Sequence, residues 1–101
     1  MVNVIASIHI KAGNLPEFLK IFWSNVPAVR AEKGCIEYFP AVDIDTGLPP
    51  QVLDLNMVTV IEKWESVEAL RDHLAAPHML AYREKVKDMV AGLSIKVLRE
   101  A

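Results

Sequence analysis

The sequence predicts an α+β protein of ferredoxin-like order, βαββαβ, built on an antiparallel sheet. Segments rich in β-branched residues, with apolar side chains at every second position, lie at residues 2–10, 35–42, 57–65 and 93–99. The stretches after the first and third of these segments carry apolar residues at steps of three and four, which is typical of amphipathic helices. This order of strands and helices is that of a ferredoxin-like sheet. At 101 residues, we expect one domain over 1–101.

The first strand, residues 2–10, carries apolar residues on both of its faces. Asn14 can cap the helix that follows, and Pro16 is tolerated in a first helical turn. Pro27 is expected to kink this helix and Gly34 to end it. One stripe of the helix should pack on the sheet, and it consists of Leu15, Phe18, Leu19, Phe22, Trp23, Val26 and Val29.

The second strand and the segment after it are expected to be irregular. Pro40 cannot donate a hydrogen bond, so it predicts an edge or a bulge near the far end of strand 35–42. Residues 43–56 contain Gly, Asp and a Pro pair and predict a long loop. Loops of this length are uncommon unless they are functional. We therefore expect residues 43–56 to fold over a pocket mouth or onto a partner chain.

The third strand leads into two helices. Ser66 can cap a short helix that Pro77 ends, and a further helix is predicted at about 78–91. Its apolar face would carry Met79, Tyr82, Val86, Met89 and Val90.

A candidate site lies in these last elements. Glu62 and Trp64 share one face of the third strand, because side chains alternate along a strand. If that face meets the helices, burial raises the pKa of the Glu62 carboxyl group. His73 falls on the buried stripe of its helix, while His78 and Tyr82 share one edge of the last helix. These residues could line one cavity, but a solvated glutamate, a core tryptophan and core histidines would give the same pattern.

No metal site is predicted. Glu62, His73 and His78 are ligand types suited to zinc or iron, but no HxxxH or HxH spacing supports them. The single cysteine, Cys35, excludes an internal disulfide and is expected to be a packed residue in a reducing compartment.

Charge and hydropathy exclude other classes of protein. Eleven basic against 13 acidic residues argue against nucleic acid, because phosphate backbones need clustered Lys and Arg. The first residues have no basic region and no long apolar run, so we expect no signal peptide, and no run approaches the ~20 residues of a membrane span. We expect a cytoplasmic protein without membrane insertion. Apolar residues form 52% of the chain, which predicts that some apolar surface is an interface.

Over essentially its whole length the chain resembles the antibiotic biosynthesis monooxygenase family, in particular its small bacterial quinol monooxygenases. The resemblance is carried by VIASIHIKAG near the start, AEKGCIEY at 31–38, IEKWESVEALRDHLAAPHMLAY at 61–82 and the closing IKVL. It implies a homodimer in which two ferredoxin-like sheets pair into a dimeric α+β barrel. One face of the sheet would then meet the helices and the other face the partner.

The resemblance also implies oxidation of quinols or polycyclic phenols by molecular oxygen, without flavin, haem or metal. The sequence has no glycine-rich dinucleotide fingerprint, so the substrate itself would supply the electrons. A base must remove the hydroxyl proton, and within this resemblance the candidates are His73 or His78, oriented or tuned by Glu62. The substrate walls are expected at Tyr38, Val60, Trp64 and Tyr82.

The resemblance leaves alternatives open. Haem-degrading relatives use an asparagine and a histidine where this chain has Ala6 and Arg83, so haem is disfavoured. Many antibiotic-pathway members carry an asparagine at the position of Val60, so their catalytic residues do not transfer directly. A non-catalytic small-molecule binding or stress-response module, or an isomerase of a signalling metabolite, would have the same fold.

Overall fold

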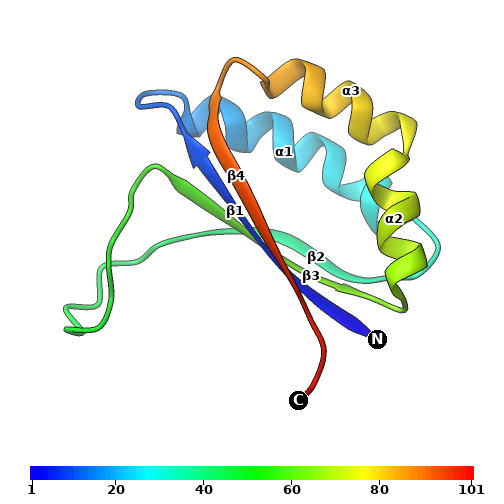
Figure 1. Ribbon diagram of the computed structural model, residues 1–101. Helices are drawn as coiled ribbons and strands as arrows, with labels where there is room; N and C mark the ends of the chain where they lie inside the picture. Colours follow the sequence, from blue (N-terminus) through cyan, green and yellow to red (C-terminus); the bar gives the residue numbers. More distant parts are fainter.

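The computed structural model describes residues 1–101 and contains four strands and three helices (Figure 1). In chain order these are β1 (Val2–Ile10), α1 (Leu15–Arg30), β2 (Cys35–Val42), β3 (Met57–Trp64), α2 (Val67–Ala75), α3 (Pro77–Val86) and β4 (Val90–Leu98). The order βαββααβ confirms the predicted ferredoxin-like α+β chain. Two short helices, α2 and α3, occupy the second helical position because the chain is extended at Ala76 between them.

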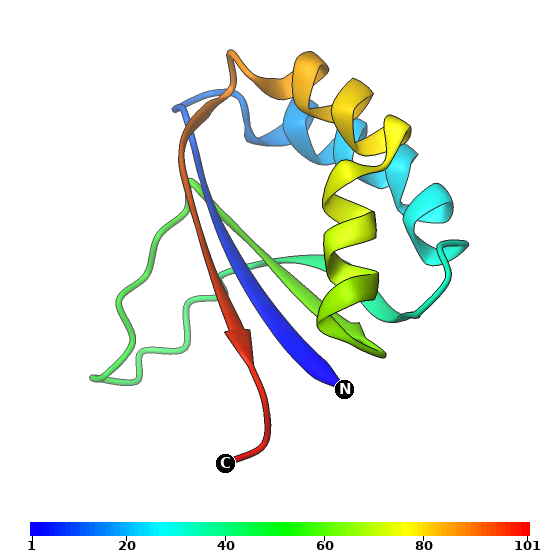
Figure 2. The ribbon, with the colours of Figure 1, turned by 45° about the vertical axis from the view of Figure 1, so that its right-hand side comes forward.

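The strands form one antiparallel sheet in the order β2-β3-β1-β4. Ala6 of β1 lies between Val60 of β3 and Ile95 of β4, and Tyr38 of β2 is opposite Glu62. All three helices lie on one face of the sheet, and the other face is bare in the single chain (Figures 1 and 2). Both outer strands, β2 and β4, are edge strands.

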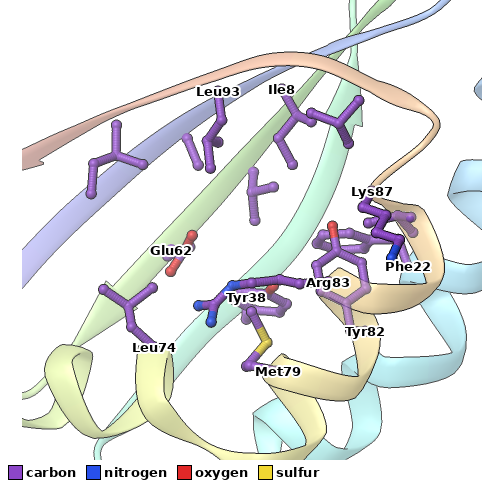
Figure 3. Close-up of a pocket in the computed structure, with 15 residues that line it drawn as sticks. Ile8, Phe22, Tyr38, Glu62, Leu74, Met79, Tyr82, Arg83, Lys87 and Leu93 are labelled. Atoms are coloured by element: carbon purple, nitrogen blue, oxygen red, sulfur yellow. The ribbon is translucent and has the colours of Figure 1, made fainter.

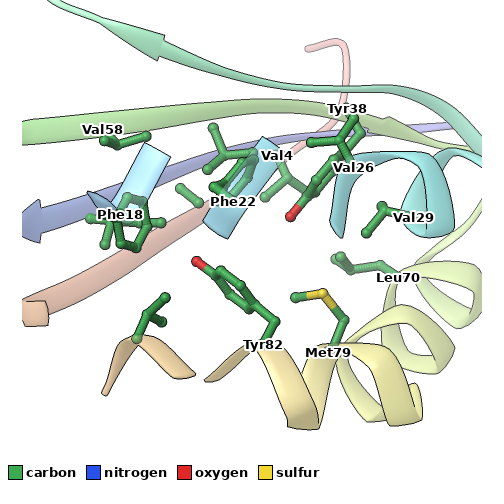
Figure 4. Close-up of a cluster of buried hydrophobic side chains, with 14 of the residues drawn as sticks. Val4, Phe18, Phe22, Val26, Val29, Tyr38, Val58, Leu70, Met79 and Tyr82 are labelled. Carbon is green, nitrogen blue, oxygen red and sulfur yellow. The ribbon is translucent and has the colours of Figure 1, made fainter. Parts of the chain in front are cut away.

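The core lies between the helix-covered face of the sheet and α1. On β3 every second side chain is buried, from Val58 to Trp64, as the alternating pattern predicts. The buried stripe of α1, Phe18, Phe22, Val26 and Val29, packs in the same core cluster (Figure 4). Burying each of these large apolar side chains contributes about 1.5–3 kcal/mol to the free energy of folding. This packing fixes the sheet relative to α1.

Three predictions of element boundaries or irregular pairing are wrong: the end of the first helix, the irregular end of the second strand and the end of the last helix. The first helix ends at Arg30, so Gly34 belongs to the following turn. Pro40 does lie on an edge strand, but the irregular pairing of β2 falls between Cys35 and Glu37, at its near end.

The last helix ends at Val86 instead of residue 91. Met89 donates its backbone N–H to the Val86 carbonyl in a turn (2.8 Å) and accepts from the Lys11 backbone N–H (2.9 Å). Val90 then begins β4 opposite Ile10. Met89 thus closes the turn and Val90 joins the sheet because pairing with β1 is available there, and helical periodicity alone does not reveal that competition.

Residues 43–56, called the arm below, connect β2 to β3. The arm extends away from the side of the sheet that carries the helices (Figures 1 and 2). Hydrogen bonds within the arm hold its shape, including one from the Asp54 backbone N–H to Asp43 Oδ2 (2.9 Å). No helix of the protein is both long and apolar enough to cross a bilayer.

A substitution at Gly34 tests the packing of the turn after α1. Gly34 has a φ of +87°, and an added Cβ would lie 2.6 Å from the Ala69 Cβ of α2. Gly13 has nearly the same φ, +86°, with nothing within 4 Å of an added Cβ. Both alanine variants incur the cost of a left-handed backbone, but only Gly34→Ala adds a collision. We expect Gly34→Ala to lower the free energy of unfolding, measured with urea, by about 1–3 kcal/mol more than Gly13→Ala. Equal losses would contradict this packing.

Candidate functional site: a cavity with a buried carboxyl group

An apolar cavity of about 330 Å³ lies between the sheet and α3 (Figure 3). Twelve of its 15 lining residues are hydrophobic, and they come from all four strands and all three helices. Charged or hydroxyl-bearing side chains reach it at only a few positions, namely Tyr38, Glu62, Tyr82, Arg83 and Lys87. This is the usual composition of a small-molecule site, in which few polar groups orient an apolar ligand.

Glu62 is the charged residue buried in this cavity, at 7% exposure. The alternation of β3 turns its side chain toward the helices, and Trp64, two residues further on, donates its indole N–H to Glu62 Oε1 (2.9 Å). Burial raises the pKa of the Glu62 carboxyl group to about 7, and the negative charge of Glu32 adds to the rise. The hydrogen bond from Trp64 offsets part of this shift. Near neutral pH the carboxyl group can therefore either accept or donate a proton.

Two tyrosines form an aromatic wall with Phe22. The Phe22 ring stacks on Tyr38 (centroids 5.5 Å apart) and meets Tyr82 edge-on (5.7 Å). Burial raises the pKa of both phenols above the ordinary value of 10, so both stay neutral at physiological pH. A neutral phenol can donate a hydrogen bond to a ligand.

The two candidate histidines lie outside the cavity lining and share a partner that the sequence did not suggest. Glu32 Oε2 lies 2.8 Å from both His73 Nδ1 and His78 Nε2. His73 is buried against the rings of Trp64 (centroids 4.6 Å apart) and Tyr38 (5.4 Å). Its burial lowers its pKa more than the contact with Glu32 raises it, which favours a neutral imidazole. His78 is partly exposed and lines a smaller, polar hollow between α1 and α3.

The structure thus brings together part of the predicted site. Of the residues expected to contact the substrate, Tyr38, Val60 and Tyr82 line the cavity together with Glu62. Trp64 does not line the cavity; it donates a hydrogen bond to the Glu62 carboxyl group. The roles predicted for all these residues, and for the two histidines, stay predictions.

Sequence reasoning missed three charged residues near the cavity. Arg83 of α3 and Lys87, the C-cap residue of that helix, line the cavity and lie four residues apart, so the i, i+4 spacing that begins at Met79 would have indicated them. Glu32 lies 41 residues before His73 in the chain, and no local spacing indicates their contact.

Other reactive side chains form no second centre. No three His, Cys, Asp or Glu side chains form a group that could hold a metal ion. Cys35 is packed against the core, as predicted, and burial is the largest cause that raises the pKa of its thiol. A raised pKa disfavours the thiolate, which is the nucleophilic form.

Fold and cavity together define a small ferredoxin-like α+β protein with a mainly apolar cavity between sheet and helices that contains a carboxyl group. The chain belongs to the antibiotic biosynthesis monooxygenase family, because the model of that family, described as "Antibiotic biosynthesis monooxygenase", matches residues 1–85. This membership confirms the resemblance seen in the sequence.

Curated relatives match the chain over nearly its full length. It is 39% identical over 105 residues to a protein of Escherichia coli K12 named "Probable quinol monooxygenase YgiN". The match covers 98% of this chain and 97% of that protein, and the protein of the same name from Shigella flexneri matches equally well.

Solved structures show the same fold at lower sequence identity. PA3566 from Pseudomonas aeruginosa has a TM-score of 0.83 and 23% identity, covering 99% of this chain and 93% of that chain. Rv0793 from Mycobacterium tuberculosis has a TM-score of 0.81 and 24% identity, with coverage of 99% and 94%. At these identities, the likeness establishes the fold alone.

The raised pKa of Glu62 predicts a specific pH dependence of stability. The ordinary pKa of a glutamate carboxyl group is 4.5, and the pKa of Glu62 in the folded protein is about 7. Between these two pH values the folded protein keeps a proton on Glu62 that the unfolded chain releases. Wild-type stability should therefore fall as pH rises through this window, whereas Glu62→Gln, which cannot ionise, should lack that loss. We expect urea unfolding to show the variant gaining up to ~3 kcal/mol relative to wild type between pH 4 and 8. Glu37→Gln, at an exposed carboxyl group of β2, is the matched control. A constant difference between wild type and Glu62→Gln would contradict the raised pKa.

Proposed function

We propose that the protein is a cofactor-independent monooxygenase that oxidises a quinol or polycyclic phenol with molecular oxygen. The observation that carries the proposal is the Glu62 carboxyl group, which titrates near neutral pH inside an apolar cavity of about 330 Å³. This volume falls within the range of about 300–1,000 Å³ that is usual for small-molecule sites. The relatives named as quinol monooxygenases support the same substrate class.

In the proposed reaction, Glu62 accepts the proton of a substrate hydroxyl group. A phenolic hydroxyl group has a pKa of about 10, so transfer to a carboxylate of pKa about 7 is uphill by roughly 4 kcal/mol. The positive charges of Arg83 and Lys87 at the cavity favour the resulting anion. The transfer yields the electron-rich form of the substrate that reacts with oxygen.

The quinolate then reduces oxygen without another electron donor. One oxygen atom forms a bond to a ring carbon, and the resulting peroxide loses water as that carbon becomes a carbonyl group. Quinol and O₂ thus give a hydroxyquinone and water, which balances atoms and electrons. The proton held by Glu62 leaves with the water, and the carboxylate is restored for the next cycle.

We assign the base to Glu62 because it lines the cavity, whereas His73 and His78 contact Glu32 outside it. The histidines remain the alternative base, and a protein that binds the quinol without turnover remains the alternative function. Both alternatives are outcomes of the experiment below.

The test is oxygen uptake with 1,4-dihydroxynaphthalene, corrected for autoxidation. We expect the rate to rise with pH and to level off above the pKa of about 7 of Glu62. Glu62→Gln should lower the rate by about a hundred- to ten-thousand-fold, which is the usual cost of losing a general base. His73→Gln and His78→Ala should keep the wild-type pH profile.

The same assay distinguishes the alternatives. Incorporation of one ¹⁸O atom from ¹⁸O₂ into the product separates monooxygenation from simple oxidation to the quinone. If a histidine variant, and not Glu62→Gln, abolishes turnover and the pH dependence, the base is that histidine. Saturable quinol binding without oxygen uptake above the autoxidation rate would leave only a binding module.

We further propose that the protein is a homodimer formed through the bare face of the sheet. Ile5, Phe39 and Ile61 lie on this face in neighbouring strands and are only partly buried in the single chain. A chain with 52% apolar residues and one uncovered sheet face is expected to bury that face against a second copy.

Light scattering at micromolar concentration should give the mass of a dimer. Ile5→Asp places a charge in the centre of the proposed interface, and we expect it to yield monomers or unfolded chains. Lys11→Asp, at an exposed residue just beyond β1, is the control and should stay dimeric. A wild-type protein of monomer mass would contradict the dimer.

A further inference from the structure

The arm, residues 43–56, has a defined shape although it makes little use of its apolar side chains. The Gln51 side chain donates to the Ile44 carbonyl (2.7 Å) and accepts from the Thr46 backbone N–H (3.3 Å), and Asp43 and Asp54 join the two ends. Yet four of its five large apolar side chains are more than half exposed, namely Ile44 (71%), Leu48 (63%), Val52 (88%) and Leu55 (67%), and Leu53 is 39% exposed. An ordered segment with this much exposed apolar surface is typical of an interaction site.

The arm does not cover the cavity of its own chain. None of its residues lines the cavity. It also extends away from the face on which the helices enclose that cavity (Figures 1 and 2). Of the two roles that its length predicts, contact with a partner chain is therefore the one consistent with its position.

The cavity, in turn, is open along β4. Leu93 and Ile95 line it and pair with Ile8 and Ala6 of β1, so they lie on the helix-covered side of the sheet. They are nevertheless 64% and 48% exposed, because β4 is an edge strand and no helix extends over it. The apolar wall on this side is therefore incomplete in a single chain.

Charge is complementary between the arm and this opening. The arm carries Asp43, Asp45 and Asp54 and contains no Lys or Arg. Arg83 and Lys87 line the cavity, and Figure 3 shows the Arg83 side chain extending from α3 across it. Arg83 makes no ion pair within its own chain, so its charge is available to an incoming acidic segment.

We propose that, in the homodimer, the arm of each protomer closes the cavity of its partner along β4. Leu48 and Val52 of one chain would pack on Leu93 and Ile95 of the other, and the acidic residues of the arm would face Arg83. The inference rests on the proposed dimer but not on turnover. It makes the binding site a product of both chains, with the arm as the wall that contacts the part of the ligand remote from Glu62.

Cross-linking tests which chain the arm touches. In a Cys35→Ala background, protein carrying Val52→Cys is mixed with protein carrying Leu93→Cys under conditions of subunit exchange, and a short bis-maleimide is added. We expect a covalent heterodimer. The control replaces Val52→Cys with Val67→Cys, at an exposed valine of α2, and should give little heterodimer.

Ligand binding tests whether the arm is part of the site. Val52→Asp should weaken binding of 1,4-naphthoquinone, followed by tryptophan fluorescence, by about tenfold or more, whereas Val67→Asp should leave the dissociation constant unchanged. Both variants are first confirmed as folded by circular dichroism.

Failure of this inference can be told apart from failure of the proposed function. A dimer without the 52–93 cross-link, or with unchanged binding by Val52→Asp, would overturn the role of the arm while oxygen uptake could persist. If the cross-link forms and Val52→Asp weakens quinone binding as expected, but the wild-type protein shows no oxygen uptake, the shared site is supported and the proposed turnover is overturned. A monomer that binds the quinone normally would overturn the inference as well.

Discussion

The arrangement of the site depends on the strict alternation of β3, which turns Val58, Val60, Glu62 and Trp64 toward the helices. Three of these side chains are apolar, and they form the dry environment in which the fourth, a carboxyl group, is held. The indole N–H of Trp64 bonds to Glu62 Oε1, so the carboxyl group does not lose all its hydrogen bonds on burial. A carboxyl group in such a setting keeps its proton to a higher pH than in water. Fold, cavity and proposed chemistry therefore have one origin in this strand.

A second polar group, formed by Glu32, His73 and His78, lies beside the cavity and separate from it. It joins the turn after α1 to α2 and to α3 through one carboxylate oxygen, and so fixes the helices that enclose the cavity. The rings of Trp64 and Tyr38 contact His73 on the side of the sheet. The negative charge of Glu32 also raises the pKa of Glu62. We infer that this group positions the helices and tunes the carboxyl group without contacting the ligand.

The sequence predicts what local periodicity determines. The strands, the shared face of Glu62 and Trp64 and the break between α2 and α3 follow from alternation, helical spacing and Pro77, whereas alternation alone does not show that this face meets the helices. The contact of Glu32 with two histidines joins residues 41 and 46 positions apart and depends on how three helices pack. For the same reason, Met89 and Val90 fit a helical stripe in the sequence, but Met89 lies in the turn before β4 and Val90 begins that strand, where pairing with β1 outweighs local preference. The pattern could place the histidines on buried or edge positions, but it could not show that neither of them lines the cavity.

The most direct measurement is the titration of the Glu62 carboxyl group itself. In protein labelled with ¹³C at the glutamate side-chain carboxyl carbons, the Glu62 resonance is assigned as the one absent from Glu62→Gln, and its chemical shift is followed by NMR across pH 3–9. We expect a midpoint at a pH of about 7, because burial raises the pKa of this carboxyl group. A midpoint near the ordinary value of 4.5 would mean that the carboxyl group is fully ionised and solvated at neutral pH, and it would contradict the account of the cavity and of its base.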